Sequence, residues 1–188
     1  MPPEEAGHPA GPVDTATSAT VPAVDARRRA LAWWLIATVI VADQVTKLLV
    51  QRHIPLFDSI TIIPGLLDLV HIHNAGVAFG FLNDVAHPLR SALTMMLALA
   101  ALAAIAYYAR QVHPEERLAR AGLSLVMGGA AGNLIDRVRL GHVIDFIDVY
   151  RGHWHFWAFN VADAAISCGA VLIFAELFLT RRHASHPR

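Results

Sequence analysis

Several acidic and amide residues of this chain lie inside or beside long apolar runs. The stretch FNVADAAI places Asp163 three residues after Asn160, at the start of an apolar run that continues to Leu179. In an earlier apolar run, Asp43 precedes Lys47 by four residues. Placing an ionised carboxylate in hydrocarbon costs roughly 2.5–3.5 kcal/mol or more. Two carboxylates that share one proton could hydrolyse a bond, one as general base on water and the other as acid.

These residues also have structural interpretations. Asn160 and Asp163 have the spacing of an N-cap residue and an acid at position N3, where a carboxylate favours the helix dipole. Asp43 and Lys47 share one face of a helix and can form a buried ion pair that fixes helix packing. Catalysis and structure are therefore both open at this point.

The composition indicates a membrane protein. The chain has 188 residues, of which 55% are hydrophobic and 16% charged, and its mean hydropathy is +0.46. An ordinary soluble domain has roughly 25% charged residues. A net charge of zero gives no indication of a nucleic-acid partner. The single cysteine, Cys168, excludes an intrachain disulfide.

Four windows are long and apolar enough to cross a bilayer. About 20 apolar residues span a hydrocarbon core of roughly 30 Å. The predicted spans are residues 31–50, 89–108, 118–135 and 161–180. A cleaved signal peptide could explain the first window alone, but three further spans favour an integral membrane protein.

The distribution of basic residues predicts the orientation. Most of the 15 Lys and Arg residues lie before the first span, between spans two and three, and after span four. We therefore expect both termini in the cytoplasm. We divide the chain into a disordered cytoplasmic tail (1–26), a four-helix membrane domain (27–182) and a second cytoplasmic tail (183–188).

Two segments are expected outside the membrane on the other side. Residues 52–88 contain alternating β-branched stretches broken by Pro64, Gly65 and Gly76, which predicts a small extracytoplasmic sheet. Residues 136–160 include the aromatic cluster HWHFWAF, which is typical of a headgroup interface. The expected fold is a mainly α membrane protein with four transmembrane helices, a small extracytoplasmic β-like segment and an interfacial loop or helix.

This topology brings the polar groups of three spans to one depth, near the outer leaflet. The residues concerned are Asp43, Lys47, Asn133, Asp136, Arg137, Asp145, Asp148 and Asp163. Because Asp136 is adjacent to Arg137, we interpret that pair as a structural ion pair. The convergence itself indicates a site.

Two other function classes use the same residue types. A transporter or proton-conducting protein also has intramembrane Asp, but no inverted repeat is evident and the acids lie at one surface. A metalloenzyme could use His71 with His73, His153 with His155, and nearby His142 and Asp residues, although the sequence contains no HExxH motif. We therefore expect no metal and no other cofactor.

Four motifs resemble those of lipoprotein signal peptidase, also called signal peptidase II. They are DQVTK at 43–47, NAGVAFGF at 74–81, GGAAGNLIDRVRLGHVIDFIDV at 128–149 and FNVADAAI at 159–166. They occur in the order of the family, and the resemblance covers residues 31–180.

The resemblance implies an aspartyl endopeptidase of the bacterial inner membrane, with its active site near the outer leaflet. Its partners would be membrane lipids and a diacylglyceryl-modified prolipoprotein, cleaved just before the lipidated cysteine, and we expect a monomer. The family's catalytic pair falls on Asp145 and Asp163, with Asp136 as the rival for the first role. The residues expected to bind substrate or support the site are Asn74, Asn133, Asp136, Arg137, Asn160, Asp43 and Lys47.

Overall fold

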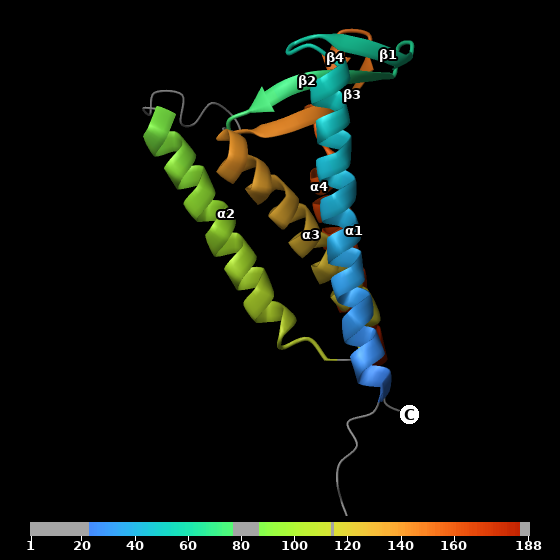
Figure 1. The fold of residues 1–188 in the computed structure, drawn as a ribbon. Helices are drawn as coiled ribbons and strands as arrows, with labels where there is room; N and C mark the ends of the chain where they lie inside the picture. Colours follow the sequence, from blue (N-terminus) through green and yellow to red (C-terminus); the bar gives the residue numbers. More distant parts are fainter. Residues whose placement is uncertain (1–22, 77–86, 114, 185–188) are drawn as a thin grey trace, which may run out of the picture.

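The chain folds into four long helices with a small sheet across one end (Figure 1). The computed structural model describes residues 23–76, 87–113 and 115–184. In chain order the elements are α1 (Ala23–His53), β1 (Ser59–Ile63), β2 (Leu67–Asn74), α2 (His87–Ala109), α3 (Arg117–Leu140), β3 (Val143–Arg151), β4 (Trp154–His155) and α4 (Val161–Ala184). The predicted fold class is confirmed.

Within the described residues, four helices are long and apolar enough to cross a membrane. They cover Trp33–His53, Ala92–Ala109, Arg117–Leu140 and Val161–Leu179. The third helix extends beyond the predicted end at residue 135. It ends instead before Gly141, whose φ of 79° takes the left-handed conformation and whose N–H bonds to the Arg137 carbonyl.

Two helices reach into the segments that we predicted as tails. Helix α1 begins at Ala23, so residues 23–26 of the predicted N-terminal tail are helical. Helix α4 likewise continues into the predicted C-terminal tail, as far as Ala184. Residues 1–22 and 185–188 of the two tails lie outside the described residues.

The sheet is antiparallel, with strand order β1-β2-β3-β4. The segment 52–88 supplies β1 and β2, as predicted. The segment 136–160, expected as an interfacial loop or helix, supplies β3 and β4. The alternation VIDFIDV explains this, because Ile144 and Phe146 pack with Val50 and Ile54 of the α1 end in a buried cluster. The sheet is thereby fixed to the C-terminal end of α1.

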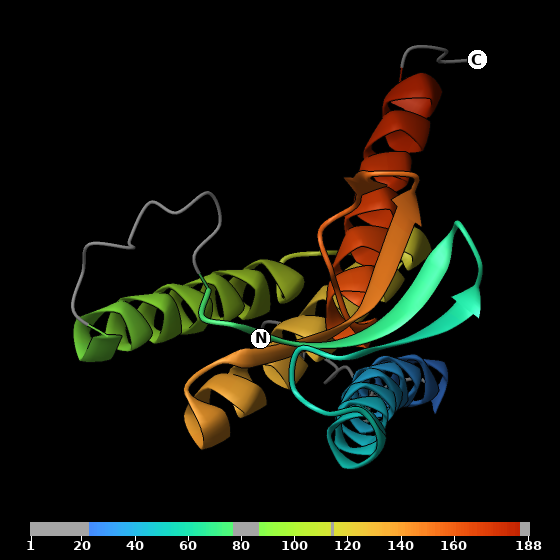
Figure 2. The same cartoon turned by 90° about the horizontal axis from the view of Figure 1, so that it is seen from above.

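Small residues bring the helices together. A Cβ added to Gly122 of α3 would lie 2.5 Å from the Gly169 carbonyl of α4, so these two backbones touch. On α3, Gly128 faces Val39 of α1 and Gly132 faces Asp43. Glycine at such positions permits close helix approach in a membrane. Figure 2 shows α1, α3 and α4 clustered below the sheet, with α2 to one side.

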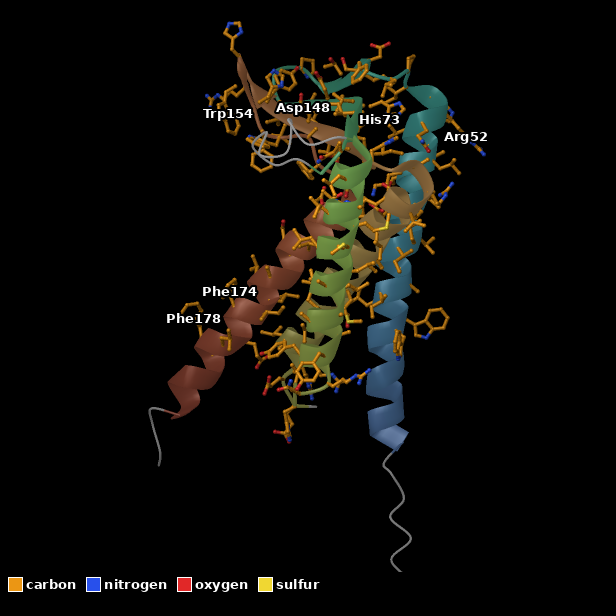
Figure 3. All side chains as sticks on the ribbon, turned by 90° about the vertical axis from the view of Figure 1, so that its left-hand side faces the viewer. Arg52, His73, Asp148, Trp154, Phe174 and Phe178 are labelled. Carbon is orange, nitrogen blue, oxygen red and sulfur yellow. The ribbon has the colours of Figure 1, made fainter. Side chains whose placement is uncertain are left out.

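The outer surfaces of the helices are apolar. The membrane-length window of α2 has no buried residues, and Phe174 and Phe178 of α4 point away from the bundle (Figure 3). A polar contact joins α4 to the start of α3. Glu176 of α4 accepts the N–H groups of Leu118 and Ala119 at 2.9 and 3.3 Å. This carboxylate caps the start of α3 from the neighbouring helix.

Candidate active site

Asn160 begins helix α4 and positions Asp163. The Asn160 Oδ1 accepts the backbone N–H of Asp163 at 3.0 Å, and the Asp163 Oδ2 accepts the backbone N–H of Asn160 at 3.3 Å. This reciprocal arrangement is a capping box, as the spacing of the two residues predicts. The positive end of the helix dipole also favours a negative charge here.

The side-chain amide of Asn160 also contacts the strand that carries Asp145. Its Nδ2 donates to Asp145 Oδ1 at 2.7 Å, with longer contacts of 3.2 Å to the Ile144 carbonyl and to Asn133 Oδ1. Asn160 is completely buried. A single amide thus joins α4, β3 and α3 at the point where the two candidate catalytic residues meet.

Asp145 is held by amides on both carboxylate oxygens. Its Oδ2 accepts from Asn74 Nδ2 at 2.9 Å, while the Asn74 Oδ1 accepts the Gly76 N–H at 2.8 Å. Only 3% of Asp145 is exposed, and this burial raises the pKa of its carboxyl to about 6. The hydrogen bond from Asn74 acts in the opposite direction, and the charge of Asp163 raises the pKa further.

Asp163 is more accessible than Asp145 and is held by Asn133. The Asn133 Nδ2 donates to Asp163 Oδ1 at 2.8 Å, and Lys47 Nζ donates to Asn133 Oδ1 at 2.9 Å. Because an ammonium can only donate, the oxygen of Asn133 must face Lys47 and its nitrogen must face Asp163. The orientation of the amide is therefore fixed by charge.

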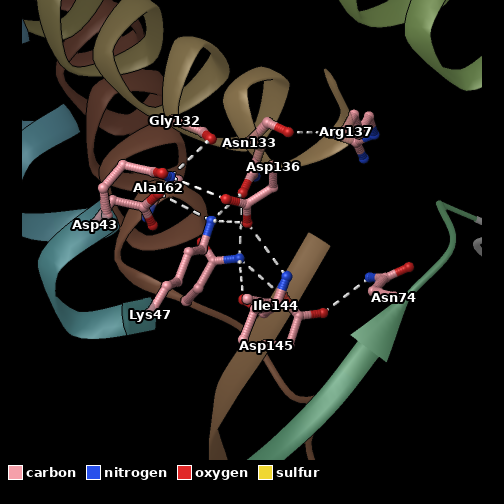
Figure 4. A network of polar contacts seen from close by, with 12 residues as sticks. Asp43, Lys47, Asn74, Gly132, Asn133, Asp136, Arg137, Ile144, Asp145 and Ala162 are labelled. Atoms are coloured by element: carbon pink, nitrogen blue, oxygen red, sulfur yellow. Dashed lines mark hydrogen bonds and ion pairs between the residues drawn. The ribbon is translucent and has the colours of Figure 1, made fainter. Parts of the chain in front are cut away.

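Lys47 lies at the centre of a buried ionic network (Figure 4). Its Nζ contacts Asp43 Oδ2 at 2.9 Å and Asp136 Oδ2 at 2.8 Å, and all three side chains are almost completely buried. The predicted pair of Asp43 with Lys47 is confirmed. One ammonium thus bridges two buried carboxylates and joins α1 to α3.

Asp136 has a different partner from the one predicted. Its ion pair is with Lys47, while the adjacent Arg137 donates to the Asn133 carbonyl at 3.3 Å. Neighbours in a helix point in different directions, so adjacent Asp and Arg side chains do not face each other. Asp136 Oδ2 also accepts the Ile144 N–H at 3.3 Å, which ties α3 to β3. Its contacts are those of a structural residue.

Asp43 supports the start of α4. Its Oδ1 accepts the backbone N–H of Ala162 at 2.9 Å, next to Asp163. Gly132 is close by, since a Cβ at that position would lie 2.7 Å from Asp43 Oδ2. Helix α1 therefore contributes both the ion pair and a hydrogen bond that orients the first turn of α4.

Gln44 belongs to the same network and was not singled out in the sequence. Its Nε2 contacts Asp136 Oδ1 at 2.9 Å, with longer contacts of 3.2 Å to Asp43 Oδ2 and the Gly132 carbonyl. Its Oε1 accepts from Arg139 at 3.4 Å. The sequence did hold a signal for this role. Gln44 is a polar residue within a predicted membrane span, and such residues usually face the protein interior.

The histidines considered as metal ligands do not form one group. His71, His73 and His142 have neighbouring rings, whereas His155 contacts Asp148 at 2.8 Å. Within the described part of the chain, no three His, Cys, Asp or Glu side chains are placed to hold a metal ion. Residues 77–81 of the second motif lie outside the described residues.

The arrangement suits acid–base chemistry. Asp145 and Asp163 come from different elements, interact electrostatically, and are joined through Asn160 and Asn133. One carboxyl is buried in a strand and the other lies at a helix N-terminus, so their environments differ. Such a pair can divide the roles of acid and base between its members.

The sequence matches known proteins over most of its length. The family model described as signal peptidase (SPase) II matches residues 35–179. A lipoprotein signal peptidase from Geobacter metallireducens is 45% identical over 149 residues, covering 79% of this chain and 91% of the relative. One from Geobacillus kaustophilus is 41% identical over 146 residues, covering 78% and 92%.

Two solved structures share the fold. Both are described as bacterial membrane enzymes, solved by the in meso method at 2.3 and 1.9 Å resolution. The first has a TM-score of 0.70 and 26% identity, covering 85% of this chain and 94% of the other. The second has a TM-score of 0.69 and 29% identity, covering 79% and 92%.

Proposed function

Because the chain belongs to the signal peptidase II family, we propose that it is an aspartyl endopeptidase that cleaves diacylglyceryl-modified prolipoproteins just before the lipidated cysteine. Family membership supports a membrane-embedded peptidase that processes lipoproteins. The observation that carries the aspartyl assignment is the joint anchoring of Asp145 and Asp163 by Asn160. No other pair of carboxylates in the described residues combines shared amide support with one accessible member.

The environments of the two carboxyls support different roles. We assign Asp163 as the general base, because it is the more accessible of the two carboxyls and can reach water. Asp145 holds the proton, because burial raises its pKa. Asp163 takes a proton from water, the water oxygen bonds to the scissile carbonyl carbon, and Asp145 protonates the carbonyl oxygen.

Cleavage then follows by return of the protons. The C–N bond breaks as the leaving amine receives the proton held by Asp163, and the carbonyl re-forms as its hydroxyl proton returns to Asp145. The products are a carboxylic acid on the signal peptide and a free amine on the lipidated cysteine. The dyad ends in its starting protonation state, so it must be treated as one coupled unit.

Two residues are placed to position the substrate. Arg137 is half-buried and lies within the electrostatic reach of both dyad residues, and it forms no ion pair with any described residue. Its guanidinium can donate to a substrate carbonyl. Asn74 lies at the end of β2 on the other side of Asp145, where its amide can contact the peptide as well as the carboxylate.

The membrane arrangement fits a lipid-anchored substrate. With the basic N-terminal flank in the cytoplasm, α1 runs outward and the dyad lies where β3 meets the outer ends of α3 and α4. Acyl chains would hold the modified cysteine at a fixed depth beside the dyad. We further propose that the enzyme works as a monomer.

Cleavage of defined peptides tests this function. Purified protein in detergent with EDTA is given a prolipoprotein peptide with or without the diacylglyceryl group on its cysteine. We expect cleavage of the lipidated peptide alone, loss of cleavage in Asp145→Asn and Asp163→Asn, and residual cleavage in a folded Asp136→Asn. Activity that disappears with EDTA and returns with zinc would refute the aspartyl mechanism.

A further inference from the structure

Three imidazoles gather at the end of the strand that carries Asn74. The rings of His73 and His142 are stacked, with centroids 3.7 Å apart and planes 24° from parallel. The His71 ring meets His73 edge-on at 5.1 Å. His71 and His73 belong to β2, while His142 precedes β3. The stack therefore joins the two strands at the end nearest Asn74.

The stack and the Asn74–Asp145 hydrogen bond are parts of one strand pairing. In the register of β2 with β3, His73 is opposite Ile144 and Asn74 is opposite Val143. Because side chains alternate between faces, Asn74 reaches Asp145 diagonally on one face while His73 lies on the other. Strand ends fray easily, so the stack limits the movement of the last residue of β2.

The hydrogen bonding indicates that the cluster is built for uncharged rings. His71 Nδ1 donates to the Ile54 carbonyl at 2.9 Å, because a carbonyl oxygen can only accept. The Nε2 atoms of His71 and His142 are buried and have no hydrogen-bond partner among the described residues. Protonation would create buried N–H donors without acceptors, which is unfavourable.

Most of the surroundings also lower the pKa values of the stacked histidines. Burial lowers the pKa of His73, and repulsion from His142 and His71 adds to this. Burial also lowers the pKa of His142, which His71 lowers further. Asp136 of α3 and a hydrogen bond with the Leu140 backbone oppose the shift at His142. The surroundings of the stacked histidines therefore oppose their protonation at low pH.

We propose that the stacked pair His73 and His142 is a positioning device that holds Asn74 on Asp145 only while the pair does not carry two charges. Two stacked imidazolium ions repel, so acid would release the end of β2 and remove one of the two amides that hold Asp145. The consequence for catalysis rests on the proposed function. The opening of the strand end at low pH does not depend on the proposed function.

Two variants of His142 separate stacking from charge. His142→Phe keeps an aromatic ring and cannot be protonated, whereas His142→Ala removes both the ring and the charge. His53→Phe is the matched control, because His53 is exposed at the end of α1 and its one hydrogen bond with a described residue is to the Leu49 carbonyl of its own helix. Hydrogen exchange of backbone amides in residues 71–76 is measured from pH 7 to pH 5 for all four proteins, after correction for intrinsic rates.

The exchange measurement decides the proposal. We expect protection of this segment to fall about tenfold on acidification in wild type and in His53→Phe, to stay high in His142→Phe, and to be low at every pH in His142→Ala. Equal acid sensitivity of wild type and His142→Phe would overturn the device. So would full protection of wild type at pH 5.

Cleavage kinetics test the link to Asn74. Relative to wild type, His142→Phe should keep its neutral-pH kcat/KM and retain about tenfold more of it at pH 5, the scale expected for a hydrogen bond to a carboxylate. In the Asn74→Ala background this difference should vanish. A difference that persists without Asn74 would overturn the positioning route. If wild type cleaves no lipidated peptide at any pH, the proposed function fails while the exchange result stands.

Discussion

The side-chain N–H of Asn160 donates to Asp145 at 2.7 Å, and its side-chain oxygen caps helix α4, whose first turn contains Asp163. The same residue therefore positions the first carboxylate directly and the second through the backbone. The cap and the proposed support of a catalytic carboxylate are therefore compatible at this position. They are two uses of one side chain, made possible because the amide has both a donor and an acceptor.

The two uses of Asn160 can be separated by substitution. Asn160→Ser keeps a good N-cap but cannot reach Asp145 with an amide, while Asn160→Ala loses both. We expect Asn160→Ala to lower the free energy of unfolding by about 1 kcal/mol more than Asn160→Ser. Both variants should lose about tenfold or more in kcat, because Asp145 becomes a carboxylate when it protonates the substrate and would then lack a charge-assisted hydrogen bond. Wild-type kcat in a folded Asn160→Ser would contradict the assigned contact.

The ionic network predicts unequal effects for its members. Lys47→Met leaves Asp43 and Asp136 buried without their cation, which should lower stability by about 3–5 kcal/mol. Asp136→Asn leaves Lys47 paired with Asp43, so its effect should be smaller. Thermal unfolding in detergent, followed by tryptophan fluorescence, compares the two. A Lys47→Met protein as stable as Asp136→Asn would show that the network is not the main support of the site.

The contact of α3 with α4 depends on Gly129. A Cβ at this position would overlap the Ala162 carbonyl, which is a backbone atom and cannot rotate away. Alanine normally stabilises a helix by roughly 1 kcal/mol relative to glycine. Here we expect Gly129→Ala to be destabilising and to lower kcat, because Ala162 adjoins Asp163. A neutral or raised melting temperature would contradict this packing.

The raised pKa of Asp145 predicts a pH-dependent stability. Between the ordinary value of 3.8 and the folded-state value of about 6, the folded protein binds more protons than the unfolded chain. The free energy of unfolding therefore falls as the pH rises through this window, by about 3 kcal/mol for this group. The lowered pKa values of His73 and His142 act in the opposite direction, since stability is lost as the pH falls below 6.5.

The difference between wild type and Asp145→Asn isolates the carboxyl. Both proteins carry the histidines, so their contribution cancels when the two stability curves are subtracted. We expect Asp145→Asn to gain stability relative to wild type as the pH rises from about 4 to about 6, with no further change above that. A flat difference curve would mean that Asp145 is not perturbed by burial.

Much of the fold follows from local patterns in the sequence. The positions of the four helices are set by apolar length, and the Asn160–Asp163 cap is set by spacing within one segment. The pairing of Asp43 with Lys47 is equally local, because four residues make one helical turn. Such features depend on few neighbours and can be predicted without knowing how the helices pack.

Contacts between elements could not be predicted in the same way. The partner of Asp136 depends on the rotation of α3 against α1, which brings Lys47 rather than Arg137 to its carboxylate. Gln44 becomes a member of the network for the same reason. The stack of His73 on His142 requires the register of β2 with β3. Helix rotation and strand register are set by the packing of the whole core, so no single motif predicts them.

If Asp145 and Asp163 work as one unit, a double-mutant cycle will show it in the catalytic rate. The kcat for the lipidated peptide is measured for Asp145→Asn, Asp163→Asn and the double variant, each confirmed as folded by its melting temperature. We predict that each single change lowers kcat by about a thousandfold or more and that the double change lowers it no further, because residues acting as a unit are not additive. Losses that multiply in the double variant, or a single variant within tenfold of wild type, would contradict the dyad.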